Sequence, residues 1–122
     1  MHILWIAAAG ALGVLSRYGL TRIMTRPEAA FPWATFSINI LGSFLIGLLV
    51  GSFHPSDKFF GHLPAIAVTT GFLGGFTTFS AFSLESLVLF RNGQPVLALS
   101  YIIGSTVLGL LAAAWGFSIQ IS

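Results

Sequence analysis

The sequence GFLGGFTTFSAF, residues 71–82, interrupts an otherwise helix-like apolar segment. Its twelve positions hold three glycines, two adjacent threonines, one serine and four phenylalanines. Glycine lets the backbone leave helical geometry. Backbone groups freed at membrane depth must be buried in protein or line a cavity, because lipid offers them no hydrogen bonds. The stretch therefore predicts a membrane helix that is broken at its centre, at a functional site.

Composition indicates a polytopic membrane protein. Of the 122 residues, 56% are hydrophobic and 7% charged, and the mean hydropathy is +0.95. At roughly 20 residues per span, the chain holds four helices in a single domain, residues 1–122, with no room for a soluble catalytic domain. No pairing of nucleophile and base is visible, so we expect no enzyme. The absence of cysteine excludes disulfides and thiolate metal sites.

Charge and targeting signals exclude two further classes. The pI near 9.7 rests on five basic against three acidic residues, too few and too scattered for a nucleic-acid interface. The first apolar run lacks the basic start and small-residue exit of a cleavable signal peptide. We therefore expect this run to be the first membrane span.

Four spans are predicted, at about residues 3–20, 33–53, 63–90 and 95–119. The third is longer than a straight crossing requires, and an unwound centre would use the excess. The connection before it contains His54 and His62, which are not spaced as metal ligands and which we expect at the membrane interface.

Two charged residues of the spans need an explanation. Arg17 lies deep in the first span, where it would snorkel to the interface, act as a buried structural clamp, or draw anions into a vestibule. Glu85 follows the predicted break in the third span. It would be either a charge near the membrane surface or a partner for an arginine on a neighbouring helix, and the surface position is favoured.

A polar stripe follows one face of the second span. Thr35, Asn39 and Ser43 recur every four residues. The Asn39 amide offers two donors and an acceptor, which are costly to leave unpaired in a membrane. It would either join helices by hydrogen bonds or point an N–H group at a dehydrated anion.

The residues after the break predict an anion pathway. Phe79 and Phe82 are three apart and share a helical face. Phenyl rings are positive at their edges, so rings presented edge-on hold an anion weakly. Packing against lipid or protein is the alternative for such a pair. The hydroxyls of Ser80, Tyr101 and Ser105 would add donors.

The break contains no carboxylate, so a metal bound there would depend on backbone carbonyls, which suit sodium or potassium. The connections after the first and third spans carry Arg22, Arg26 and Arg91, and the opposite side carries Lys58 and the amino terminus. This basic excess gives a weak orientation signal, so the chain could insert both ways. A four-span chain cannot enclose a pore alone, which favours an antiparallel homodimer.

Three motifs together resemble the Fluc (CrcB) family of fluoride channels. They are AGALGVLSRY at residues 9–18, NILGSF at residues 39–44, and GFLGGFTTFSAF at residues 71–82 followed by Ser83, Leu84 and Glu85. Their order and spacing agree with the family over all four spans. Ala81 departs from it, because a threonine is usual at this position.

The resemblance implies a passive fluoride channel of the cytoplasmic (inner) membrane, an antiparallel dual-topology homodimer with two pores and a central structural sodium ion. By position, Phe79 and Phe82 resemble the phenylalanine box, Asn39 the pore asparagine, and Arg17 the arginine of the first span. The carbonyls of Gly74 and Thr77 from both subunits would hold the sodium.

Two rival functions remain open. A small proton-coupled four-helix exporter requires a titratable carboxylate at membrane depth, and spans one, two and four contain none. A non-transporting assembly subunit would use its glycines only to pack helices.

Overall fold

A computed structural model describes residues 2–53, 58–60 and 63–119. The elements in chain order are α1 (Ile3–Met24), α2 (Trp33–Ser52), β1 (Phe59–Phe60), β2 (Leu63–Pro64), the π-helix η1 (Ala67–Leu73), α3 (Gly74–Phe76), α4 (Phe79–Arg91) and α5 (Pro95–Ser118). The strands pair antiparallel in a short hairpin. The predicted interface residues His54 and His62 lie outside the described residues.

Four helical segments are long and apolar enough to cross a membrane, namely Ile3–Met24, Trp33–Ser52, Ala67–Arg91 and Pro95–Ser118. The prediction of an all-helical membrane protein with four spans is confirmed at this level. The first helix continues past the expected end at Leu20. The third segment begins with Leu63 and Pro64 paired with β1, and η1 starts at Ala67.

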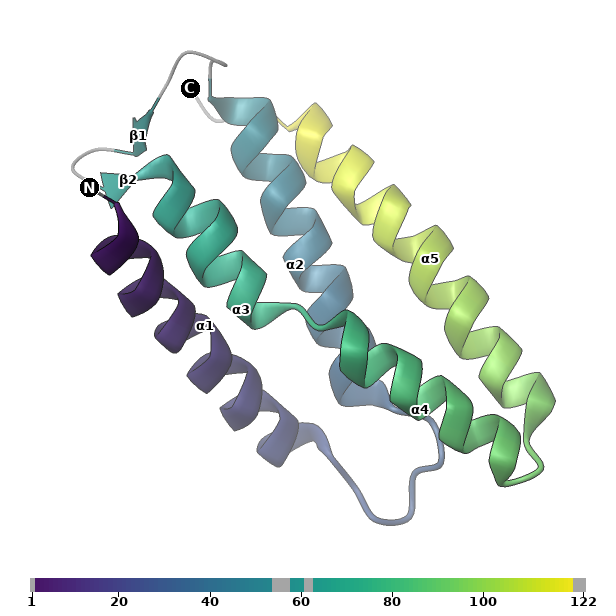
Figure 1. The fold of residues 1–122 in the computed structure, drawn as a ribbon. Coiled ribbons are helices and arrows are strands. Elements are labelled where there is room, and N and C mark those ends of the chain that lie inside the picture. The colour runs from purple at the N-terminus through teal and green to yellow at the C-terminus, as the bar shows by residue number, and fades with distance from the viewer. Residues whose placement is uncertain (1, 54–57, 61–62, 120–122) are drawn as a thin grey trace.

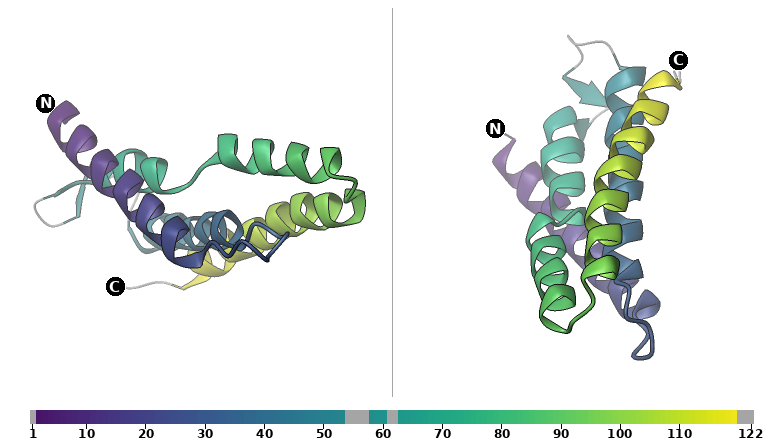
Figure 2. Two further views of the ribbon diagram at one scale, coloured as in Figure 1. Left: turned by 90° about the horizontal axis from the view of Figure 1, so that it is seen from below. Right: turned by 90° about the vertical axis from the view of Figure 1, so that its right-hand side faces the viewer.

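In the view of Figure 1 the helices follow one another in the order α1, then η1 with α3, then α2 and α5. Helix α2 packs most extensively on α5, and α1 packs on η1 and α3. Past the interruption after α3, α4 lies beside α5 instead (Figure 2). The two halves of the third segment therefore have different neighbours.

The turn between α4 and α5 shows how local sequence ends and starts a helix. Gly93 has φ +73°, the left-handed conformation that favours glycine. The Gly93 N–H is donated to the Phe90 carbonyl and the Gln94 N–H to the Leu89 carbonyl, which closes the end of α4. Pro95 then begins α5, where a missing N–H costs nothing.

Many large hydrophobic side chains of this single chain are exposed. Its small core is built around Leu89, Ala98 and Tyr101, with Phe31 and Phe82 packed against it. Large side chains are exposed along all four spans, and Phe79 is 77% exposed. Such a surface requires lipid or a protein partner to cover it.

Candidate functional site

The backbone leaves helical geometry between α3 and α4. Thr77 has φ −85° and ψ 158°, and Thr78 has φ −149° and ψ 114°, so both are extended. Thr78 caps α4, because its Oγ1 accepts a hydrogen bond from Ala81 N–H at 3.2 Å. Thr77 donates from both N–H and Oγ1 to the Leu73 carbonyl, each at 3.0 Å. The two threonines thus fix opposite sides of the interruption.

Asn39 of α2 contacts this interruption directly. Its Oδ1 accepts from Thr78 N–H at 2.8 Å and its Nδ2 donates to the Thr78 carbonyl at 3.1 Å. The Asn39 amide therefore joins α2 to the third segment by hydrogen bonds, which is the first of the two roles predicted for it. Nδ2 carries two N–H groups, and one remains for another acceptor.

These contacts change the partners of two carbonyl groups. In a continuous α-helix, Gly74 O would accept from Thr78 N–H and Thr77 O from Ala81 N–H. Instead, Thr78 N–H donates to Asn39 Oδ1, and Ala81 N–H donates to Thr78 Oγ1. Gly74 O and Thr77 O, the predicted sodium ligands, therefore lack the amide donors that a helix would supply.

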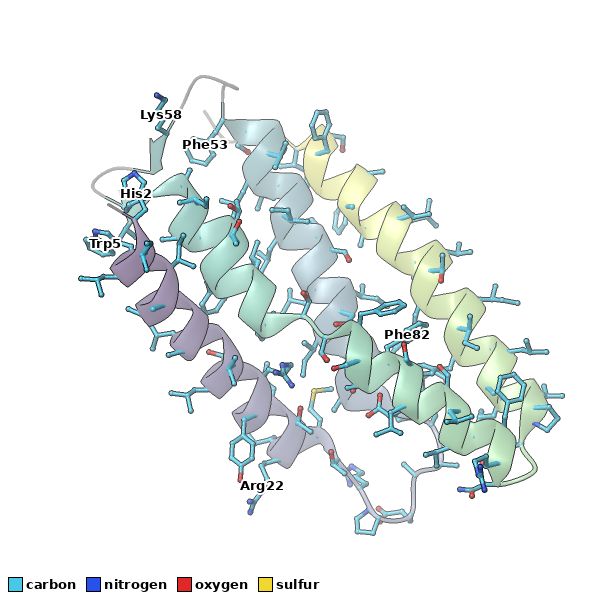
Figure 3. The ribbon with its side chains drawn as sticks, viewed as in Figure 1. His2, Trp5, Arg22, Phe53, Lys58 and Phe82 are labelled. Carbon is cyan, nitrogen blue, oxygen red and sulfur yellow. The ribbon has the colours of Figure 1, made fainter. Side chains whose placement is uncertain are left out.

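Arg17 of α1 forms a hydrogen bond with the carbonyl of Gly75, which lies between Gly74 and Thr77 in the chain. Its Nε donates to Gly75 O at 3.1 Å, and the side chain is half-buried. This contact fits a structural clamp, one of the three predicted roles. Arg22, five residues further along α1, is exposed and projects outward, with its Nη1 donating to Tyr18 OH (Figure 3).

A cavity of about 380 Å³ brings several predicted site residues together. Asn39 and Phe79 line it with the predicted sodium ligands Gly74 and Thr77. Ser43, one turn from Asn39, also lines the cavity and donates from Oγ to the Asn39 carbonyl at 2.8 Å. Predicted anion and cation sites thus face one space.

A series of ring contacts leads away from this cavity. The ring centroids of Phe79 and Phe82 are 5.8 Å apart with an interplanar angle of 43°. Phe82 lies between α4 and α5 in Figure 3, and its centroid is 5.1 Å from that of Tyr101. The predicted phenylalanine pair therefore connects the cavity at the interruption to the buried Tyr101.

The Glu85 carboxyl group contacts neighbouring helices through two hydroxyl groups. Tyr101 OH donates to its Oε1 at 2.8 Å and Thr35 Oγ1 donates to its Oε2 at 3.0 Å. The carboxyl group is thus held between α2 and α5 by two hydroxyls. Thr35 was not among the predicted site residues, although its place one turn before Asn39 on the polar stripe was a signal for it.

The two predicted serines differ in their surroundings. Ser105 lies one turn after Tyr101 on α5, and within the described residues its Oγ is buried without a hydrogen-bond partner. A buried hydroxyl without a partner is uncommon in proteins. Ser80 is exposed, and its Oγ lies 3.3 Å from Thr78 Oγ1.

A second cavity of about 620 Å³ opens beside Glu85. Thr35 and Glu85 line it at one end, and Arg26 of the connection before α2 lines it as well. Arg17, the arginine predicted for a vestibule, is among the lining residues of neither cavity. Arg26 is therefore the basic residue at this end of the site.

The described residues contain no cluster of three histidine, cysteine, aspartate or glutamate side chains that could bind a metal. Any cation at the interruption would depend on carbonyl and hydroxyl oxygens. Such hard oxygen ligands do not suit zinc or copper.

Comparison with known proteins relates the whole chain to one group. The family model described as "CrcB-like protein, Camphor Resistance (CrcB)" matches residues 4–117. A Rhizobium meliloti protein named "Fluoride-specific ion channel FluC" is 43% identical over 98% of this chain and 95% of its own. Proteins of the same name from Helicobacter acinonychis and Dehalococcoides mccartyi are 41% and 44% identical, covering 93% and 90% of this chain and 91% and 85% of their own lengths.

Proposed function

This chain belongs to the CrcB family, which consists of ion channels and not of enzymes, and we propose that it conducts fluoride passively and selectively across the cytoplasmic membrane. The resemblance in the sequence motifs is thereby confirmed. Fluoride is the ion named for the relatives, and the four membrane-length helices fit a multi-pass channel.

The observation that carries the proposal is a series of aromatic and polar side chains in contact, which would serve as weak anion-binding groups. It begins at Asn39 and Phe79 in the first cavity, passes Phe82, and reaches Tyr101. The Tyr101 hydroxyl contacts Glu85, which lines the second cavity. Ring edges and hydroxyls thus link one cavity to the other.

The chemistry of this series suits a small, strongly hydrated anion. A conducting site replaces the hydration shell with donors, yet binds weakly enough for the ion to leave. Ring edges are weakly positive, and the free Asn39 N–H, Ser80 and Ser105 hydroxyls supply donors. The one arginine near the interruption, Arg17, donates to a backbone carbonyl and lines neither cavity.

The conducting unit in this proposal is an antiparallel dual-topology homodimer with two pathways. Phe79 is 77% exposed and Gly74 is exposed in the single chain, so both are open to a partner. A two-fold axis through the interruption would give each protomer an equivalent pathway. In such a dimer, the backbone groups left without helical hydrogen bonds at the interruption would face protein and ions and would not face lipid.

A sodium ion on this axis would be held by the carbonyls of Gly74 and Thr77 from both protomers. These residues fit a sodium ion, because the N–H groups that would bond to the two carbonyls in a helix donate to other acceptors. Thr78 N–H donates to Asn39 Oδ1, and Ala81 N–H donates to Thr78 Oγ1. A bound sodium ion would hold two chains together and add a positive charge near the anion pathways.

The proton-coupled exporter remains as the second candidate, because Glu85 is held between helices and lines a cavity. A carboxyl group in this position is where a proton-exchange mechanism would need one. The two functions differ in one measurable property. A channel passes fluoride down its gradient regardless of pH, whereas an exporter requires protons to move the other way.

The test is ion efflux from liposomes that contain the purified protein. We expect rapid fluoride efflux under an imposed potential, little chloride efflux, and no dependence on a pH gradient. Phe82→Ile removes the ring edge and keeps an apolar side chain, so fluoride efflux should fall by at least about tenfold, the effect of roughly 1.4 kcal/mol. Leu108→Ile on the exposed face of α5 is the control. The channel function would be contradicted if fluoride stayed inside the liposomes, or if it left only when protons moved in the opposite direction.

A further inference from the structure

Asn39 and Thr78 form a paired contact between α2 and the interruption of the third helix. The Thr78 N–H is donated to Asn39 Oδ1 at 2.8 Å, and the Asn39 Nδ2 donates to the Thr78 carbonyl at 3.1 Å. Without Asn39, Thr78 N–H would need another acceptor, because an unpaired amide away from water is costly. The Gly74 carbonyl, four residues earlier, is the acceptor that helical geometry offers.

We propose that Asn39 is a positioning residue for the cation site: by holding the Thr78 N–H, it keeps the Gly74 carbonyl available to sodium. This inference rests on the proposed function, in which sodium at the interruption is itself proposed. It gives Asn39 a task on the cation side of the interruption in addition to the anion contact expected from the sequence.

Helix α2 is built to hold Asn39 in place. Ile38 is 1% exposed, and Gly42, one turn after Asn39, is buried against the interruption. A Cβ at Gly42 would overlap the methyl group of Thr77. The same turn of α2 therefore contacts both extended threonines, and the rigid helix can fix the geometry of the carbonyls between them.

The Thr78 hydroxyl completes the arrangement. It accepts from Ala81 N–H at 3.2 Å, so that amide does not occupy the Thr77 carbonyl. Arg17 occupies Gly75 O, and Asn39 occupies Thr78 O. These side chains leave Gly74 O and Thr77 O as the pair that shares the cavity with Asn39.

The experiment is a sodium titration of thermal unfolding, read from tryptophan fluorescence of the purified full chain in detergent. N-methylglucamine replaces sodium at constant ionic strength. The wild-type protein should be stabilised as sodium rises. In Asn39→Ala the sodium concentration at half-maximal stabilisation should increase by at least about tenfold, because the Thr78 amide is released toward Gly74 O.

Asn39→Asp separates the proposed role of Asn39 at the cation site from its role as a donor to the anion. It also replaces Asn39→Ala as the test if the alanine variant does not fold. An aspartate oxygen still accepts from Thr78 N–H, so half-maximal stabilisation should need no more than about threefold more sodium than in wild type. Fluoride efflux should nevertheless fall by at least about tenfold, because the N–H donors are lost. Ser100→Ala is the control, since the exposed Ser100 hydroxyl donates to Val96 O within its own helix and lines neither cavity.

Each outcome bears on the inference. A wild-type sodium response in Asn39→Ala would overturn it, as would an Asn39→Asp variant as insensitive to sodium as the alanine variant. If sodium did not stabilise the wild-type protein, both the proposed sodium ion and this inference would be wrong. Fluoride efflux would still test the channel function independently.

Discussion

The Tyr101 side chain is fully buried, and its ring and hydroxyl perform separable functions. The ring packs on Phe82 and Phe31, with a Phe31 centroid distance of 5.4 Å. The hydroxyl donates to Glu85 Oε1 at 2.8 Å. A substitution that removes only the hydroxyl therefore tests the proposed polar end of the pathway without opening the core.

We predict that Tyr101→Phe folds as the wild-type protein does but conducts fluoride at least about tenfold more slowly. Loss of one hydrogen bond to a carboxyl group amounts to about 1.5–3 kcal/mol, which is enough for such a change if the contact lies on the pathway. Liposome efflux measures it, with Tyr18→Phe as control because Tyr18 is 59% exposed on α1. Equal efflux from both variants would remove Tyr101 from the pathway.

At the scale of elements, close packing between α1 and the third segment depends on single glycines. A Cβ at Gly13 would overlap the Phe72 carbonyl oxygen and lie 3.0 Å from Phe76 N. Both are backbone atoms, which cannot move as the end of a flexible side chain can. Gly19 lies on the same helix with nothing within 4 Å of its added Cβ.

These two glycines form a matched pair of variants. Gly13→Ala should lower the free energy of unfolding by about 1–3 kcal/mol, the usual cost of overpacking. Gly19→Ala should leave it unchanged or raise it by up to about 1 kcal/mol, because alanine favours the helix over glycine. Thermal unfolding in detergent distinguishes them. A Gly13→Ala variant as stable as Gly19→Ala would show that α1 is not packed closely on η1.

The same elements show what local sequence could predict. Apolar runs of membrane length predicted the four helical segments. The extended residues Thr77 and Thr78 lie within the stretch 71–82 for which the sequence predicts a break, but the sequence did not single them out as the point of the break. The contacts of Asn39 with Thr78 and of Thr35 with Glu85 join residues 39 and 50 positions apart. No periodicity within one helix encodes such contacts, so sequence reasoning missed the role of Thr35 and the hydroxyl partners of Glu85.

For the whole molecule, the charge at the two ends of the spans decides whether the proposed antiparallel dimer can form. Arg22, Arg26 and Arg91 lie at or beside the connections after the first and third spans, and Lys58 and the amino terminus lie on the other side. The proposed antiparallel dimer requires both orientations in one membrane. The small charge difference permits this, because orientation follows the lysine and arginine bias of the short connections.

Charge substitutions in the connections should therefore switch the proposed channel off without touching the pathway. Asn92→Lys with Gln94→Lys adds two positive charges to the arginine side and should fix one orientation, whereas Arg22→Ser with Arg91→Ser should favour the other. Labelling of a terminal cysteine from each side of the membrane measures orientation. Each double variant alone should lose most fluoride efflux, because only parallel pairs could form, and co-expression of the two should restore it. Full efflux from a variant shown to have a single orientation would exclude the antiparallel dimer.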